Sequence, residues 1–340
     1  MHSAFPRIGI VGSGAVGIYY GARLALGGSN VRFLMRGDLA AVRERGSLRV
    51  HEGGQLEEVR PAAVFGSPAE VGPVDLAIVA LKTTQKAELE RLVGPLLGSS
   101  TPILTLQNGL GADEYLGKIF GPERIMGGLV FMAITRTGPG EIMCYHTGNV
   151  TLGELGRPPE ARTRALSGLF AASGVKAPVV ENLLEARWRK LVWNIPFNGL
   201  AIAEGGITTD RICASGALAA EARALMFEVQ RAASRFGFEI PASFIERQFE
   251  VTPPMGAYQP SSLVDFLAGR QVEVEAIWGE PLRRAAAAGV ETPRLAALYA
   301  RLSQLCSKSA FLGRAPRSSR LPFRARAGSC ADAISSARPG

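Results

Sequence analysis

The chain has 340 residues, of which 47% are hydrophobic, and its formal net charge is +8 at pH 7. This length is more than one ordinary hydrophobic core supports, so two folded domains are expected. No apolar run reaches the roughly 18 residues that a membrane-spanning helix needs. The first residues lead almost directly into the apolar stretch 8–11, without the pattern of an export signal. We therefore expect a cytoplasmic protein that does not enter a membrane.

The positive charge is concentrated at one end of the chain. Residues 307–340 contain seven basic residues and one acidic residue, a net charge of +6, which leaves only +2 for the rest. A nearly neutral body argues against a nucleic-acid-binding surface. The four cysteines and three histidines are scattered, without a CxxC pair or a His/Cys cluster, so the sequence predicts neither a disulfide framework nor a metal site.

Short β-like runs alternate with helical patterns in the first half of the chain. Residues 16–26 form a predicted helix that the Gly27-Gly28 pair ends. Such alternation is typical of βαβ units in a parallel sheet. The predicted strands are residues 7–11, 30–35, 76–81, 103–107, 124–133 and 150–152.

Amphipathic helical patterns replace the strands from about residue 181. They cover residues 184–192, 214–236, 241–249, 271–288 and 292–305. The turn residues Ala177-Pro178 precede this change, so the boundary is predicted near residue 180. The expected organisation is an α/β domain over 1–180, an all-α domain over 181–306 and a basic tail over 307–340. The tail is polar and aperiodic, which predicts disorder, with a basic anchor as the alternative.

A glycine-rich string follows the first predicted strand and opens the first predicted helix. Its residues are Gly12, Ser13, Gly14, Ala15, Val16 and Gly17. In this context the first glycine makes a tight turn, the second admits a diphosphate close to the backbone, and the third lets helix and strand pack closely. The diphosphate would then lie at the positive N-terminus of the helix. The string predicts a Rossmann domain that binds a dinucleotide.

The end of the second strand distinguishes between the two nicotinamide cofactors. NAD sites place an acidic residue there, whereas this strand is followed by Arg36, a permanent cation suited to an adenosine 2′-phosphate. The sequence therefore favours NADPH/NADP+, and Asp38 is the nearby residue that could reverse this preference. Lys82 and Gln85 follow the next strand at the ligand side of the sheet and are further candidates for contacting the cofactor.

Three polar residues share one face of the first helix of the second half. Lys190, Asn194 and Asn198 are spaced by four, so each step turns the side chain by only about 40° around the helix. A lysine and two carboxamides among apolar neighbours form a stripe that a plain core would disfavour. Pro196 lies within this helix and is expected to kink it.

Three segments of the sequence resemble the ketopantoate reductase family. The first is the run LTLQNGLG at 104–111, and the second is EARWRKLVWNIPFN at 185–198, similar to the family signature WxKxxxNxxxN. The third comprises PSSLVD at 260–265 and AGRQVEVE at 268–275. The motifs occur in family order, and the resemblance covers about residues 7–305.

This resemblance implies an α/β Rossmann domain followed by an all-α domain like the C-terminal domain of 6-phosphogluconate dehydrogenase. It implies NADPH-dependent reduction of ketopantoate (2-dehydropantoate), a step of pantothenate and coenzyme A biosynthesis, and a possible homodimer. Hydride would reach the C2 carbonyl while Lys190 donates a hydrogen bond or proton to the developing alkoxide.

The resemblance also assigns the remaining roles. Glu273 would pair with the reacting hydroxyl side, with Glu275 as its rival, and Asn108 would orient the lysine or the nicotinamide ribose. The substrate would be bound by Asn108, Asn194, Asn198 and Ser262, and Asn108 would contact the cofactor as well.

Departures from the family pattern leave other functions open. Pro196 interrupts the signature, Val272 replaces the threonine before Glu273, and the spacing from the serine pair to this glutamate is one residue short. A paralogue that reduces another branched 2-oxoacid is one alternative. A second is a dehydrogenase of a hydroxyacid or polyol phosphate, although no basic cluster outside the tail would receive a phosphate. A third is an NADPH-sensing protein without turnover, which would not need the lysine, asparagine and glutamate set.

Overall fold

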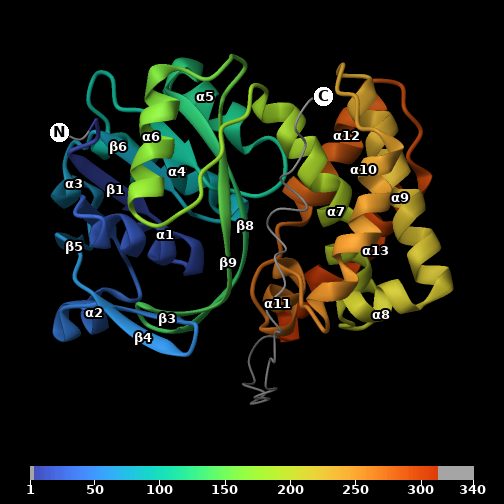
Figure 1. Cartoon of the computed structure of the whole chain (residues 1–340), viewed down its shortest axis with the longest axis horizontal. Helices are drawn as coiled ribbons and strands as arrows, with labels where there is room; N and C mark the ends of the chain where they lie inside the picture. The colour runs from blue at the N-terminus through green and yellow to red at the C-terminus, as the bar shows by residue number, and fades with distance from the viewer. Residues whose placement is uncertain (1–3, 313–340) are drawn as a thin grey trace. The chain divides into compact units, whose positions relative to one another are not determined.

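The computed structural model describes the backbone of residues 4–312 and the side chains up to residue 307. The chain folds into two compact units, which divide between Leu184 and Glu185 (Figure 1). The division falls after the predicted position because the segment after Ala177 still pairs with the sheet of unit 1. The Leu152 N–H donates to the Pro178 carbonyl at 2.8 Å, and the Val180 N–H donates to the Leu152 carbonyl at 2.9 Å.

Unit 1 is built on a nine-stranded mixed sheet with the order β4-β3-β9-β8-β7-β6-β1-β2-β5. Strands β5, β2, β1, β6, β7 and β8 run parallel to one another, and β3 runs parallel to β9, whereas β8 with β9 and β3 with β4 are antiparallel pairs. The strands are β1 (Arg7–Val11), β2 (Asn30–Leu34), β3 (Leu48–Glu52), β4 (Gln55–Val59), β5 (Ala63–Phe65), β6 (Leu76–Val79), β7 (Ile103–Thr105), β8 (Ile125–Gly138) and β9 (Glu141–Glu154).

Helices cover both faces of the parallel part of this sheet. In β6, Leu76 and Ile78 belong to the apolar core that includes α1 and α6, whereas Ala77 and Val79 belong to the core that includes α3, α4 and α5. This alternation is what a strand buried on both faces requires. The helices of unit 1 are α1 (Ala15–Leu26), α2 (Leu39–Arg45), α3 (Pro68–Val71), α4 (Leu89–Val93), α5 (Ala112–Phe120) and α6 (Ala161–Ala172), with 3-10 turns η1 (Thr83–Glu88), η2 (Gly94–Leu96) and η3 (Pro122–Arg124).

All six predicted strands are present, and the Rossmann domain is confirmed, but β3, β4 and β5 escaped prediction. β3 alternates buried Leu48 and Val50 with polar residues, and β4 is largely exposed, so neither carries a continuous apolar run. The β8–β9 hairpin is also much longer than predicted. Its register shifts near Ala133, where a Cβ on Gly148 would lie 1.3 Å from the Phe131 carbonyl oxygen.

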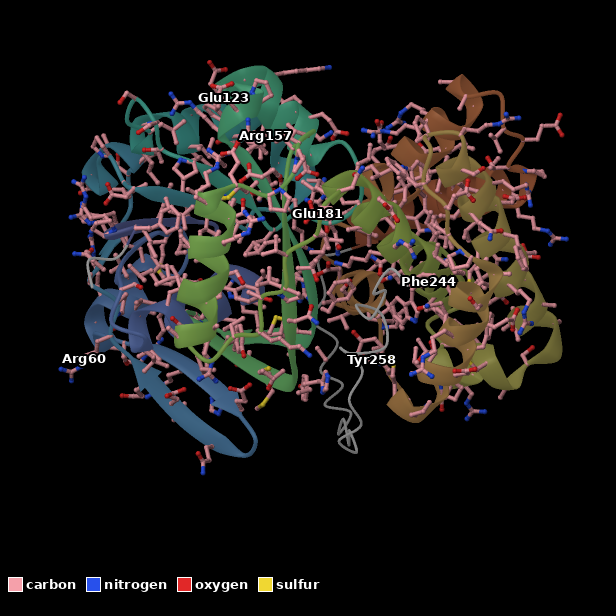
Figure 2. The ribbon with its side chains drawn as sticks, turned by 45° about the horizontal axis from the view of Figure 1, so that its top comes forward. Arg60, Glu123, Arg157, Glu181, Phe244 and Tyr258 are labelled. Atoms are coloured by element: carbon pink, nitrogen blue, oxygen red, sulfur yellow. The ribbon has the colours of Figure 1, made fainter. Side chains whose placement is uncertain are left out.

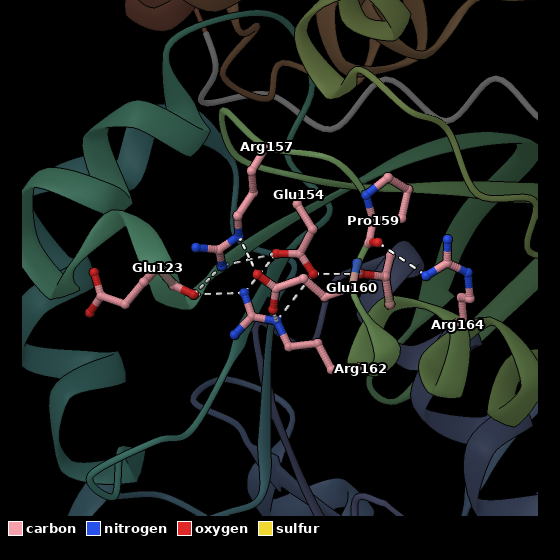
Figure 3. Close-up of polar contacts among 8 residues, drawn as sticks. Glu123, Glu154, Arg157, Pro159, Glu160, Arg162 and Arg164 are labelled. Atoms are coloured by element: carbon pink, nitrogen blue, oxygen red, sulfur yellow. Dashed lines mark hydrogen bonds and ion pairs between the residues drawn. The ribbon is translucent and has the colours of Figure 1, made fainter.

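A buried carboxylate joins the end of β9 to the start of α6 in unit 1 (Figure 3). The Glu154 side chain is fully buried, and Arg162 donates to it at 2.6 Å while the Thr163 hydroxyl donates to its other oxygen. Burial alone would raise the pKa of Glu154, but the hydrogen bonds from Arg162 and Thr163 hold it below its ordinary value. Both oxygens of the Glu154 carboxylate therefore accept hydrogen bonds, and the network links β9 to α6 as part of the structure.

Unit 2 is helical over its described residues, as predicted. Its helices are α7 (Leu183–Ala203), which begins just before the division, α8 (Thr209–Ala214), α9 (Gly216–Ser234), α10 (Ala242–Val251), α11 (Ser261–Leu267), α12 (Glu280–Ala287) and α13 (Pro293–Leu312), with the 3-10 turn η4 (Pro253–Met255) and the π-helical turn η5 (Glu275–Gly279). Its core is aromatic: Trp193 packs on Phe197 with ring centroids 5.0 Å apart, and on Tyr258, which Figure 2 labels, at 6.2 Å.

Two expectations for the helical half need correction. The predicted helix 214–236 is interrupted at Ser215, whose hydroxyl accepts from the Leu218 N–H and caps α9. Helix α13 continues to Leu312, so the first residues of the predicted tail are helical. The rest of the tail, with both the disorder and the anchor interpretations, lies outside the described residues. Within the described part of the chain, no helix is long and apolar enough to cross a membrane.

Candidate active site

The predicted cofactor residues of unit 1 all follow strands that end at one edge of the sheet. Val11 lies opposite Leu34 and Val79, and Val79 lies opposite Thr105. The segments that leave these four positions therefore emerge side by side, at the ligand side of a doubly wound sheet. We call them the cofactor edge: the glycine-rich loop after β1, the turn after β2, η1 after β6 and the loop after β7.

The glycine-rich loop has the geometry that its sequence predicts. Gly12 has φ of +112°, and a Cβ there would lie 2.8 Å from the backbone of Ala80 and Leu81. A Cβ on Gly17 would lie 1.9 Å from the Gly12 carbonyl oxygen, whereas one on Gly14 would meet nothing within 4 Å. Gly14 also precedes the first turn of α1, which no side chain caps. Open space beside helix N–H groups fits a diphosphate.

The two charged residues of the turn after β2, Arg36 and Asp38, have different surroundings. Arg36 is exposed, and its positive charge adds to that of Arg91, which is the main cause of the lowered pKa of Glu88 in η1. Asp38 is only 2% exposed, and its Oδ2 accepts from the Gly140 N–H at 2.9 Å while its Oδ1 pairs with Arg136. Both carboxylate oxygens of Asp38 are therefore bonded within its own chain.

The two other segments of the edge bring further polar groups. Lys82 is the N-cap of η1, and the buried Oε1 atom of Gln85 has no hydrogen-bond partner among the described residues. Asn108 is half-buried in the loop after β7, beside Gly109 with φ of +77°. An unsatisfied buried acceptor and an open glycine cradle fit the hydroxyls and diphosphate of a dinucleotide.

In unit 2, the predicted polar stripe is present on α7, and a fourth residue extends it. Asn194 and Asn198 are 7% and 2% exposed, Lys190 is half-buried, and Arg187 is 3% exposed. We call these four residues the α7 face. Pro196 does not break the helix, which continues to Ala203. The indole of Trp278 donates to the Ile195 carbonyl at 2.9 Å, next to the proline.

The electrostatics of Lys190 differ from those of an ordinary lysine. Burial, reinforced by the positive charge of Arg187, lowers its pKa from 10.5 to about 7, and Glu273 opposes this shift. Glu275 has other partners: its carboxylate pairs with Arg283 at 2.8 Å and accepts from the Tyr299 hydroxyl at 2.5 Å. Of the two candidate acids, Glu273 is thus the one that acts on the charge of Lys190.

Asn198 and Ser262 are brought into direct contact. The Oδ1 atom of Asn198 accepts from the Ser262 N–H at 2.9 Å, at the first turn of α11. This bond ties α11 to α7 and leaves the amide NH₂ of Asn198 and the hydroxyl of Ser262 as the groups that could face a ligand. The sequence pattern did not reveal this tie, because 64 residues separate the two positions.

Three residues that act on the predicted site residues or their helix were not found from the sequence: Arg187, Arg136 and Trp278. Arg187 lies three positions before Lys190, so helical spacing could have placed it on the same face. Arg136 and Trp278 act on residues far away in the chain, and no local pattern marks them. Among the described residues there is no cluster of His, Cys, Asp and Glu that could hold a metal ion.

Comparisons with known proteins match both units. Residues 8–157 match the model of the family "Ketopantoate reductase PanE/ApbA", and residues 182–305 match that of its C-terminal domain. A 2-dehydropantoate 2-reductase of Nostoc sp. is 36% identical over 304 residues, which are 88% of this chain and 95% of the relative. The crystal structure of a 2-dehydropantoate 2-reductase from Geobacter metallireducens GS-15 has a TM-score of 0.84 and 38% identity, covering 88% of this chain and 99% of that one.

A more distant structure has the same fold. It is a D-mandelate dehydrogenase in complex with NADH and anilino(oxo)acetate, with a TM-score of 0.82 and 23% identity over 89% of this chain and 99% of that one. The glycine-rich loop of the cofactor edge and the α7 face both lie within the residues that the two family models match. The chain belongs to the ketopantoate reductase family of NAD(P)-dependent oxidoreductases.

Proposed function

We propose that the chain reduces 2-dehydropantoate to pantoate with NADPH. Lys190 carries the proposal: it is a lysine on a buried polar helix face, with a pKa lowered to about 7 by burial and Arg187 and held up by Glu273. A general acid works best when its pKa lies near the operating pH, because it is then both charged and able to release its proton. The relative from Nostoc sp. is named a 2-dehydropantoate 2-reductase, which supports 2-dehydropantoate as the substrate.

When bound, the nicotinamide would supply the hydride that reduces the C2 carbonyl of the substrate. Protonated Lys190 donates a hydrogen bond to the carbonyl oxygen and gives up its proton as that oxygen becomes an alkoxide. Positive charge held at this oxygen stabilises the transition state more than the ground state, so it accelerates the reaction. Glu273 keeps Lys190 charged and pairs with the hydroxyl that forms.

The remaining residues would orient the two ligands. Asn194, the amide NH₂ of Asn198 and the hydroxyl of Ser262 are proposed to bind the substrate, and Asn108 to orient the lysine or the nicotinamide ribose. The glycine-rich loop, Lys82 and Gln85 would hold the diphosphate and ribose groups. Arg36 would bind the 2′-phosphate, because Asp38, the acid that could have favoured NAD, is committed to Arg136 and Gly140.

One assay tests the substrate and the cofactor together. Oxidation of NADPH and of NADH should be followed with a panel of 2-oxoacids that includes ketopantoate, other branched 2-oxoacids and benzoylformate. The proposal expects the highest kcat/KM for ketopantoate with NADPH. A higher value for another 2-oxoacid would identify a paralogue with a different substrate, and cofactor binding without turnover of any member would support a sensor.

A further inference from the structure

An ion pair between the buried Asp38 carboxylate and the partly exposed Arg136 side chain links the turn that follows β2 to the tip of the β8–β9 hairpin. Asp38 is 2% exposed, and its carboxylate is shared between the Arg136 guanidinium and the Gly140 N–H, about a hundred residues away in the chain. Arg136 also donates from Nε to the Gly138 carbonyl at 3.2 Å. Both oxygens of the carboxylate are therefore satisfied within unit 1, as a buried charge requires.

The tip of the hairpin is packed as well as bonded. Gly140 has φ of +62°, and a Cβ there would lie 2.3 Å from Cγ2 of Val42 in α2. From the other end of α2, Arg45 donates to the Pro139 carbonyl at 3.1 Å and to the Gly140 carbonyl at 3.3 Å. The hairpin is thus held at both ends of α2, and only the contact with Asp38 lies beside Arg36.

The backbone of this turn transmits the position of Asp38 to Arg36. The Leu39 N–H donates to the Arg36 carbonyl at 3.3 Å, and the Val42 N–H donates to the Asp38 carbonyl at 2.9 Å. Arg36 is exposed and its long side chain has many rotamers, so the position of its backbone decides which space its guanidinium can reach. A fixed backbone lowers the ordering cost of a charge-assisted bond to a phosphate.

We propose that Asp38 is a positioning residue for cofactor selectivity: clamped by Arg136 and Gly140, it fixes the turn that presents Arg36 to the 2′-phosphate of NADPH. This inference rests on the proposed role of Arg36. It reverses the role that an acid near the end of the second strand has in NAD sites, where the carboxylate itself binds the ribose. Here the acid supports the cation that selects the phosphate.

The experiment measures the Kd of NADPH and of NADH for the wild type and four variants: Arg36→Ala, Asp38→Asn, Arg136→Met and Arg45→Gln. A full charge-assisted contact corresponds to about 10- to 100-fold in affinity, and its partial loss to roughly tenfold or less. Arg36→Ala should remove the preference for NADPH. Asp38→Asn and Arg136→Met should each weaken NADPH binding by roughly three- to tenfold, without changing the Kd of NADH.

Arg45→Gln is the matched control, because it loosens the same hairpin tip without contacting Asp38. Its ratio of NADH to NADPH affinity should stay at the wild-type value, and melting temperatures report whether each variant folds. If Arg45→Gln lowers the ratio as much as Asp38→Asn does, general loosening explains the effect and the inference falls.

Double variants separate positioning from direct contact. In the Arg36→Ala background, neither Asp38→Asn nor Arg136→Met should weaken NADPH binding further, because both act through Arg36. A further loss with Arg136→Met would show that Arg136 itself contacts the phosphate, which overturns the inference. If Arg36→Ala keeps the wild-type ratio of NADH to NADPH affinity, the proposed role of Arg36 in cofactor preference fails. If Arg36→Ala changes this ratio but Asp38→Asn and Arg136→Met do not, the role of Arg36 stands and only the inference about Asp38 fails.

Discussion

The cofactor edge of unit 1 and the α7 face of unit 2 carry the predicted cofactor and substrate residues in different ways. The glycine-rich loop of the cofactor edge relies on backbone: a glycine with positive φ, an open glycine and an uncapped helix terminus, all within residues 12–17. The α7 face relies on buried side chains, whose charge depends on residues elsewhere in unit 2, such as Glu273. Changes at the edge should therefore act on binding and folding, and changes at the α7 face on chemistry.

Removal of the Lys190 amine should have the largest effect on catalysis. We expect Lys190→Ala to lower kcat by roughly 10²- to 10⁴-fold, the usual contribution of a general acid, while the Kd of NADPH changes little. Lys190→Arg keeps the charge but not the compact ammonium group, so it should not restore turnover. Steady-state kinetics and cofactor titration measure the two quantities. Near wild-type turnover of 2-oxoacids by Lys190→Ala would mean that the α7 face is structural.

Two glycines of the cofactor edge should respond in opposite ways to the same substitution. A Cβ on Gly17 would overlap the Gly12 carbonyl oxygen, so Gly17→Ala should lower the free energy of unfolding by about 3 kcal/mol. Gly14→Ala meets open space, and its stability should stay within about 0.5 kcal/mol of the wild type.

The added methyl of Gly14→Ala should instead weaken dinucleotide binding, because it occupies the space proposed for the diphosphate. Denaturant unfolding and NADPH titration distinguish the two effects. Unchanged NADPH affinity in Gly14→Ala would place the diphosphate elsewhere.

The pH dependence of turnover should move in opposite directions when either charged neighbour of Lys190 is removed. Reduction needs protonated Lys190, so kcat/KM should fall as the pH rises through its pKa of about 7. Arg187 lowers this pKa, so Arg187→Met should move the alkaline limb to higher pH. Glu273 raises it, so Glu273→Gln should move the limb to lower pH, in addition to slowing turnover. If the alkaline limb stays in place in both variants, a group other than Lys190 is responsible for it.

The features that the sequence predicted well are those encoded over short distances. The strand, glycine-rich string and helix of the cofactor motif occupy residues 7–26, and Lys190, Asn194 and Asn198 share one helix, so periodicity alone brings each group together. Resemblance added Glu273, which lies 83 residues beyond Lys190.

Features that depend on distant pairing were not predictable. β3 aligns with β9, almost a hundred residues later, and its exposed face is too polar to look like a buried strand. Asp38 illustrates the same limit at one residue: its position suggested a ribose-binding acid, and only the fold shows that Arg136 and Gly140 occupy it. The partners of Glu275, which set it apart from Glu273, come from α12 and α13.

The smallest effect on catalysis that we predict concerns the link between the π-helical turn η5 and α7. Trp278 and Trp193 are both buried, and each indole donates one hydrogen bond of 2.9 Å, to the Ile195 carbonyl and to the Thr252 hydroxyl respectively. Replacement by phenylalanine should lower the free energy of unfolding by about 1 kcal/mol in both cases, the typical worth of one such bond plus a small loss of packing.

The two substitutions should nevertheless differ in catalysis. Trp278 joins the segment that follows Glu273 to the part of α7 between Asn194 and Asn198, whereas the partner of Trp193 lies at the end of α10. Trp278→Phe should therefore lower kcat by a few-fold and shift the alkaline limb of the pH profile to lower pH, because Glu273 is held less firmly near Lys190. Trp193→Phe should leave that limb in place. Equal pH profiles for the two variants would show that the π-helical turn supports folding but not the charge of Lys190.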